Sequence, residues 1–108
     1  MPEHIAPMQK GNLFAAAEAP PEGERFEALL THRNLVVERI VSSATAVGTA
    51  YVQAQDEWVA LLAGEATLEV AGESVELRAG DYLFLPAGTQ HVVRRVTQGA
   101  VWLAIHLY

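Results

Sequence analysis

Apolar and polar residues follow a strand-like pattern along most of the chain after residue 34. The run "LVVERIVS" (35–42) is rich in β-branched residues, and "TAYVQ" (49–53) is a shorter run of the same kind. Residues 57–88 continue as four apolar runs, and residues 91–108 add two more. The breaks between these later runs fall at Gly64, Ala71–Gly72, Gly80–Asp81 and residues 97–99. Seven or eight short strands with such frequent turns predict an all-β sandwich or a small antiparallel barrel.

The first part of the chain has a different pattern. Residues 15–24, "AAAEAPPEGE", mix helix-favouring alanines with two prolines and a glycine that would break a helix. Phe26, Leu29 and Leu30 then lie at helical spacing, although "RFEALL" fits a short strand equally well. We therefore divide the chain into an N-terminal arm, residues 1–34, with either a short strand or a helical turn, and a barrel domain, residues 35–108.

Composition narrows the possible partners. The chain has 108 residues, of which 51% are hydrophobic, enough for one packed core. Its net charge is −6 and its basic residues are scattered, which argues against a nucleic-acid partner. It has no cysteine, no signal-peptide pattern and no stretch near the roughly 20 apolar residues of a membrane span. We expect a single cytoplasmic domain that binds neither nucleic acid nor membrane.

The stretch "GDYLFLPAGTQHVV" carries the most specific spacing in the chain. Gly80 is followed after five residues by Pro86, then by Gly88 and, two residues later, by His91. This order resembles the second sequence motif of the cupin superfamily, G-x5-P-x-G-x2-H-x3-N, with Arg95 in the place of the final asparagine. Four of the five fixed positions of that motif are therefore met.

The first cupin motif, G-x5-H-x-H-x3/4-E-x6-G, is present only in part. Glu57 and Gly64 have the spacing of its second half, whereas its two histidine positions hold Tyr51 and Gln53. Gly48 lies too close to serve as its leading glycine. The stretch "YVQAQDEWVALLAGEA" (51–66) also resembles a subset of small bacterial cupins in which glutamine replaces one metal-binding histidine. The resemblance covers roughly residues 35–107.

This resemblance implies a double-stranded β-helix, the cupin or jelly-roll form of antiparallel barrel, with one metal ion in its mouth. The implied metal ligands are Gln53, Glu57 and His91. Strand alternation also allows Tyr51, Gln53 and Glu57 to face one interior, where a divalent metal would satisfy buried polar groups. One imidazole and two oxygen donors suit Zn, Mn, Fe or Ni.

Each candidate also has a simpler interpretation. His91 could cap a strand at the surface, Gln53 and Glu57 could be solvated, and Tyr51 could pack in the core instead of bounding the pocket. His106 shares a strand face with Trp102 and Ala104, so it is either a spare ligand and proton carrier or a residue of the outer sheet. Arg95, expected on the same face as His91 and Val93, could bind a substrate carboxylate or lie in solvent. Gln55 and Asp56 are competing donors, and His4 and His32 are expected at the surface.

Three functions remain open from the sequence. The first is a small metal-dependent enzyme of the dioxygenase, isomerase, cyclase or lyase type acting on a compact oxygenated metabolite, with Glu57 or His106 moving a proton. The second is a non-catalytic small-molecule-binding domain, and the third is a structural or interaction protein whose site is degenerate. Trp58 lies out of phase with Glu57 and needs cover from the arm or from a second subunit, so we expect a homodimer.

Overall fold

In the computed structural model, residues 8–108 are described, and they form strands and loops without a helix. No segment of these residues therefore qualifies as a membrane-spanning helix. The strands are β1 (Glu24–His32), β2 (Leu35–Ser42), β3 (Ala50–Tyr51), β4 (Asp56–Ala63), β5 (Glu65–Val70), β6 (Glu73–Arg78), β7 (Tyr82–Leu85), β8 (His91–Val96) and β9 (Ala100–Leu107). The predicted all-β class is confirmed.

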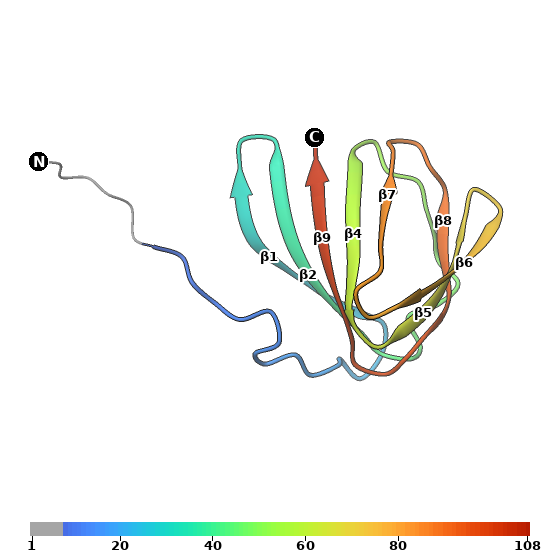
Figure 1. Cartoon of the computed structure of the whole chain (residues 1–108), viewed down its shortest axis with the longest axis horizontal. Helices are drawn as coiled ribbons and strands as arrows, with labels where there is room; N and C mark the ends of the chain where they lie inside the picture. The colour runs from blue at the N-terminus through green and yellow to red at the C-terminus, as the bar shows by residue number, and fades with distance from the viewer. Residues whose placement is uncertain (1–7) are drawn as a thin grey trace, which may run out of the picture.

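Two antiparallel sheets build the barrel. Five strands form one sheet in the order β1-β2-β9-β4-β7, and four form the other in the order β3-β8-β5-β6. Figure 1 shows the strands of the five-stranded sheet side by side, with β8, β5 and β6 beyond its β7 edge at the right of the view. Strand β9, the last of the chain, lies between β2 and β4 and pairs with both along nearly its whole length. Pairing between strands that are far apart in the sequence is typical of a jelly roll, the fold that the resemblance to cupins implied.

The predicted turns fall where the sequence placed them. Ala71 and Gly72 both have positive φ, 48° and 86°, and join β5 to β6 through a two-residue hairpin. A type I′ turn needs positive φ at both positions, and its twist matches that of the flanking strands. Gly64, φ 91°, turns β4 into β5 so close to Thr97 and Ala100 that a Cβ would clash with them.

The space between the sheets is filled by apolar side chains from both of them. The members of this core that are almost fully buried include Leu61, Ala66, Leu68, Leu85 and Trp102. Alternate residues of β4 and β5 point inward, as the strand period requires. Beside β2, β4, β8 and β9 this core leaves a hollow, which core residues such as Leu68, Leu85 and Trp102 help to line.

The run "RFEALL" (25–30), which fits a helical turn or a strand by its sequence, lies in strand β1, and β1 pairs along all of β2. A register shift between Ala28 and Leu30 places an extra residue, Leu29, in β1, and such a bulge interrupts strict alternation. This extra residue explains why the apolar residues of "RFEALL" imitate helical spacing.

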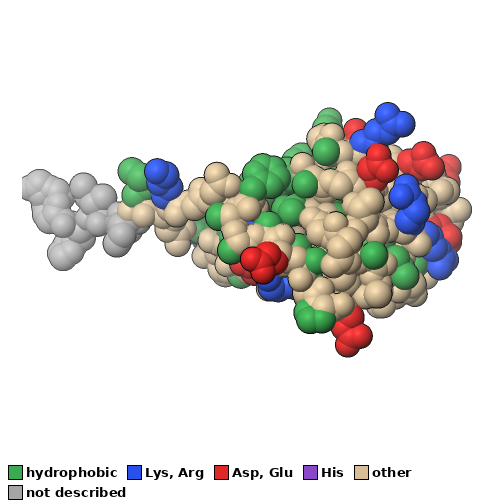
Figure 2. All heavy atoms as spheres, turned by 90° about the horizontal axis from the view of Figure 1, so that it is seen from below, with side chains coloured by type: hydrophobic (Ala, Val, Ile, Leu, Met, Phe, Trp, Pro, Cys, Tyr) green, Lys and Arg blue, Asp and Glu red, His purple; other side chains and the backbone are tan. Residues whose placement is uncertain are grey.

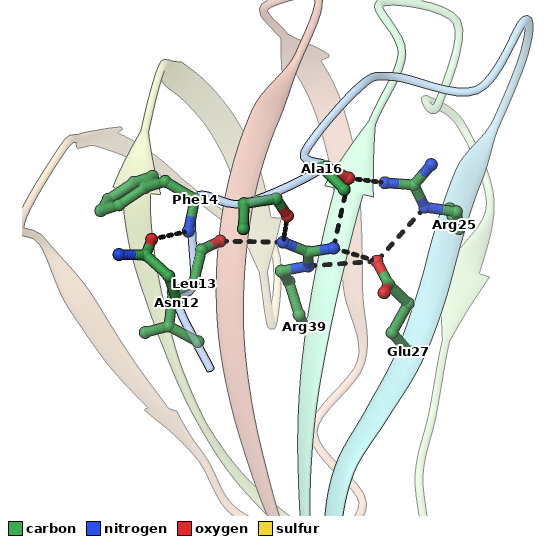
Figure 3. Close-up of polar contacts among 8 residues, drawn as sticks. Asn12, Leu13, Phe14, Ala16, Arg25, Glu27 and Arg39 are labelled. Atoms are coloured by element: carbon green, nitrogen blue, oxygen red, sulfur yellow. Dashed lines mark hydrogen bonds and ion pairs between the residues drawn. The ribbon is translucent and has the colours of Figure 1, made fainter. Parts of the chain in front are cut away.

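The residues ahead of β1 cross the outer face of the five-stranded sheet. Arg39 projects from β2 into this crossing and donates hydrogen bonds to the carbonyl oxygens of Leu13, Ala15 and Ala16 (Figure 3). It also donates two hydrogen bonds to Glu27 on β1, at 2.7 and 3.1 Å. Arg39 is only 5% exposed, so the chain ahead of β1 is fastened to the sheet by a buried guanidinium.

The charged side chains are unevenly spread over the face drawn in Figure 2. Acidic and basic side chains gather at the end of the molecule away from the arm, whereas apolar side chains occupy the region where the arm meets the sheets. Strands β5 and β8 carry an exposed ion pair of Glu69 with Arg94, whose atoms lie 3.1 Å apart. Exposed pairs of this kind contribute little to stability.

Candidate functional site

A cavity of about 80 Å³ lies between the two sheets. At roughly 10–15 Å³ per water, it has room for several waters or one compact organic molecule. Both sheets contribute to its walls, which comprise Glu24, Phe26, Glu38, Ile40, Tyr51, Gln53, Glu57, Val59, Leu68, Leu85, His91, Val93, Trp102 and His106. The three residues expected to bind a metal, and both second-choice contacts, Tyr51 and His106, therefore line one hollow.

The proline–glycine corner sets the position of His91. The carbonyl of Pro86 accepts a hydrogen bond from the Thr89 amide at 3.1 Å, and Gly88 between them has φ 82°, which is a type II turn. The Gly88 amide donates to the Gln53 carbonyl at 2.8 Å, and the Ala87 amide donates to Asp56 Oδ1 at 2.8 Å. The corner is thus fixed to the segment that carries Gln53 and Glu57.

His91 begins β8 directly after this corner and is 9% exposed. Its Nδ1 lies 3.4 Å from the carbonyl oxygen of Thr89, a contact that favours a proton on Nδ1 and leaves Nε2 as the acceptor. The Tyr51 ring stacks on the imidazole with centroids 5.6 Å apart. The histidine is therefore held in one orientation by a backbone carbonyl and an aromatic ring.

Among residues 8–108, Glu57 carries the one buried side-chain polar atom that has no hydrogen-bond partner. It is 6% exposed, and its Oε1 has no hydrogen-bond partner. Burial raises the pKa of Glu57 above its ordinary value, whereas His106 and His91 act to lower it and Glu38 adds to the rise. A buried carboxylate oxygen without a partner is costly, and a ligand, a cation or a proton would satisfy it.

His106 lies opposite Glu57 in the β4–β9 pairing, and both of its ring nitrogens have partners. Gln55 Nε2 lies 3.1 Å from Nδ1, and Glu38 Oε1 lies 3.2 Å from Nε2. If the Gln55 amide donates to Nδ1, the proton of His106 is on Nε2 and points to Glu38. His106 thus faces the cavity as part of a Gln55–His106–Glu38 chain and has no free nitrogen to serve as a spare ligand.

Two cavity carboxylates were missed as site residues. Glu24 lies on β1, ahead of both motifs, and its Oε2 accepts a hydrogen bond from Ser42 Oγ at 3.1 Å. Ser42 in turn accepts from Trp102 Nε1 at 3.0 Å. In the sequence, Glu38 only interrupts the apolar run 35–42. It lies two residues before Ile40, and this spacing was the one signal that both side chains face the same side of the strand. Burial raises the pKa of Glu24; the Ser42 hydrogen bond opposes this rise, and repulsion from Glu38 and Glu57 adds to it.

Arg95 is exposed and does not line the cavity. The expected shared face of His91, Val93 and Arg95 is wrong, because Thr67 pairs with Arg95 while its neighbour Leu68 pairs with Val93. The intervening residue forms a β-bulge, which turns Arg95 to the outside.

Other expected surface residues can be placed as well. His32 is exposed, while His4 lies outside the described residues. Trp58 is half-buried and stacks on Tyr82, with ring centroids 5.4 Å apart.

The donor set decides whether a metal fits this cavity. Across residues 8–108, no three His, Cys, Asp or Glu side chains gather closely enough to hold a metal ion. A third protein ligand must therefore come from another residue type, and Gln53, half-buried in the same wall, offers an amide oxygen. The unpartnered Glu57 Oε1, the His91 imidazole and this amide form a weak but chemically suitable set for a first-row divalent ion.

Comparisons with known proteins agree with the architecture. The family model described as "Cupin domain" matches residues 40–106. A protein from Ralstonia eutropha JMP134, described as a candidate mannose-6-phosphate isomerase, is 36% identical with a TM-score of 0.85, covering 93% of this chain and 98% of its own. No curated protein matched the chain.

Two more distant structures share the fold alone. An RmlC-like cupin from Shewanella frigidimarina NCIMB 400 is 21% identical with a TM-score of 0.73, covering 93% of this chain and 94% of its own. A predicted oxalate decarboxylase from Thermotoga maritima is 20% identical with a TM-score of 0.68, covering 78% of this chain and 79% of its own. With both barrel sheets, the motif corner and the family match in agreement, this chain belongs to the cupin family.

Proposed function

We propose that the cavity holds one divalent metal ion through His91, Glu57 and Gln53, and that the chain is a small metal-dependent enzyme for a compact oxygenated metabolite. The observation that carries this proposal is the buried Glu57 Oε1, which has no partner although it lies in the wall of an open cavity with His91. Zn, Mn, Fe and Ni all accept such mixed nitrogen and oxygen donors.

The cavity walls also suit a reaction that moves a proton. When bound, the metal would polarise a carbonyl or hydroxyl oxygen of the ligand. Glu38 lines the cavity and accepts a hydrogen bond from His106 Nε2, so its carboxylate can take a proton from a ligand while the Gln55–His106 pair holds it in position. Apolar walls from Leu85, Val93 and other core residues limit the entry of water.

A metal-free binding protein is the second candidate. It is favoured by the absence of any three-residue His, Cys, Asp or Glu group among residues 8–108 and by the fully partnered His106. In that function the cavity would bind a small molecule without turnover, and Glu57 would hydrogen-bond to it directly.

Metal content after purification without chelators separates the two candidates. We expect about one first-row divalent ion per chain in the parent, and a loss of most of it in His91→Ala, because imidazole is the best donor of the set. His32→Ala is the matched control, because His32 is exposed and should leave the metal content unchanged. A parent that contains no metal, or a His91→Ala variant that contains as much as the parent, would contradict the metal proposal and support the second candidate.

We also propose that two copies of the chain associate as a homodimer. The outer side of the five-stranded sheet exposes Tyr82 and Phe84 on β7, at 64% and 58%, beside the half-buried Trp58. Apolar surface of this kind is favourable to bury between subunits. Sedimentation velocity that shows only monomers at tens of micromolar, on the order of the usual affinities of weak dimers, would contradict this assembly.

A further inference from the structure

The three carboxylates in the cavity differ in how they are held. Glu57 is buried with one free oxygen, Glu38 is paired with His106, and Glu24 is fixed by Ser42. The Ser42 hydroxyl is itself fixed by the Trp102 indole, and both of these residues are almost fully buried. Glu24 is therefore a positioned side chain, and only its Oε2 is used by this chain of hydrogen bonds.

No positive side chain balances these acids within the cavity. Of the residues that the structure describes, neither a lysine nor an arginine lines it, and Arg95 faces outward on β8. The Gln55–His106–Glu38 contacts fit a neutral imidazole. The three carboxylates carry three formal negative charges. If one divalent ion is bound at Glu57, one formal negative charge in the cavity remains unbalanced.

The walls around Glu24 favour the same kind of ligand. The aromatic rings of Phe26, Tyr51 and Trp102 line the cavity with it, and aromatic faces attract cations. Phe26 is 54% exposed, so its ring also faces solvent. A second, polar hollow next to the 43–49 loop shares Glu24, Phe26, Tyr51 and Val93 with the first. Glu24 therefore lies where the two hollows meet.

We propose that Glu24 is a binding residue of this cavity and that, with Glu38, it selects a compact ligand that carries a protonated amine beside its hydroxyl or carbonyl group. The proposal rests on the ligand-binding cavity of the proposed function. The oxygen end of such a ligand lies toward His91 and Glu57, and its ammonium group lies toward Glu24. Anionic ligands are disfavoured, because a carboxylate or phosphate would meet carboxylates without a basic side chain to receive it.

Three probes of similar size test the charge preference. 1-Amino-2-propanol, propane-1,2-diol and lactate each have a hydroxyl on the second carbon, and they are respectively cationic, neutral and anionic at pH 7. Binding is followed on the indole N–H signals of the 15N-labelled protein as purified. Trp102 lines the cavity and contacts Ser42, whereas Trp58 stacks on Tyr82, so Trp58 is an internal control.

We expect the amino alcohol to shift the Trp102 signal with a Kd at least tenfold lower than that of the diol, and lactate to produce no saturable shift. Glu24→Gln should weaken binding of the amino alcohol at least fivefold. Glu76→Gln, which removes the same charge from an exposed position on β6, should leave it unchanged. Equal binding of the three probes, stronger binding of lactate, or equal effects of the two variants would overturn the proposal.

The same titration in protein treated with EDTA separates this proposal from the metal assignment. Retained preference for the amine with dependence on Glu24, in a protein that holds no metal, would leave the present proposal standing while the metal-dependent function fails. A protein that holds metal at His91 but does not prefer the amine would give the opposite result.

Discussion

Arg39 and Glu57 are both buried ionisable residues of the same five-stranded sheet, but they face opposite sides of it. Arg39, on the outer side, donates to three backbone carbonyls and to Glu27. Glu57, on the inner side, leaves one carboxylate oxygen without a partner. A satisfied buried charge holds the structure together, whereas an unsatisfied one next to a cavity costs stability and leaves an oxygen free to meet a ligand.

The largest expected effect is on the outer side. Arg39→Met keeps the length of the side chain but removes the donor to the Leu13 and Ala15 carbonyls and leaves Glu27 with Arg25 alone, so we expect a loss of about 2 kcal/mol in the free energy of unfolding. Chemical denaturation measures this loss, and limited proteolysis should show earlier cleavage near residues 13–16.

The matched control for this change is Arg25→Met. Arg25 also bonds to Glu27 and to the Ala16 carbonyl, but its side chain is 37% exposed. Its loss should cost less than about 1 kcal/mol, because exposed pairs are weak. If the two variants lost equal free energy of unfolding, burial of the Arg39 guanidinium would not be the reason for its larger contribution.

The next effect concerns the metal proposed on the inner side. Gln53→His replaces a neutral oxygen donor by an imidazole, and we expect the affinity for a divalent metal to rise about tenfold. The backbone carbonyl of Gln53 holds the Gly88 amide, so the substitution leaves that contact intact. Competition with a chromogenic chelator measures the change, and an affinity no higher than that of the parent would exclude Gln53 from the ligand set.

The smallest effect is a gain in stability. In metal-free protein, Glu57→Gln should raise the free energy of unfolding at pH 7 by about 1 kcal/mol, because the amide carries no charge to be desolvated. Burial raises the pKa of Glu57 in the folded state above its ordinary value of 4.5. The parent therefore loses stability as pH rises from that value through the raised pKa.

The pH dependence provides the check on this sign. The difference between Glu57→Gln and the parent should be small below pH 4.5, grow as pH increases, and then reach a plateau. Thermal unfolding at a series of pH values measures it, with Glu76→Gln as the exposed carboxylate control. A difference that is largest at low pH would show that Glu57 is stabilised as a charged group in the metal-free protein.

Local patterns in the sequence were sufficient for much of the fold. The turns at Gly64 and Ala71–Gly72 require backbone conformations that few residues favour, so their positions are visible in the residues themselves. The corner before His91 is equally local, since Pro86 and Gly88 set the type II turn. The family resemblance then related this corner to Glu57 across the barrel.

Features that depend on strand partners could not be predicted in this way. The bulges at Leu29 in β1 and between Val93 and Arg95 in β8 are defined by pairing with β2 and β5, and each reverses the facing of the residues beyond it. Glu24 entered the cavity for a similar reason. Its place depends on the pairing of β1 with β2 and on a hydrogen bond to Ser42, and neither is encoded in the residues around it.

The contacts of Arg39 constrain the sequence and the length of the segment ahead of β1 to different degrees. Its hydrogen bonds to Leu13, Ala15 and Ala16 all end on main-chain oxygens, which every amino acid possesses. Side chains at these three positions can therefore be exchanged in protein engineering while the anchor persists. Insertions or deletions between residue 16 and β1 would instead move the carbonyls out of reach, so the length of this segment is more tightly constrained than its composition.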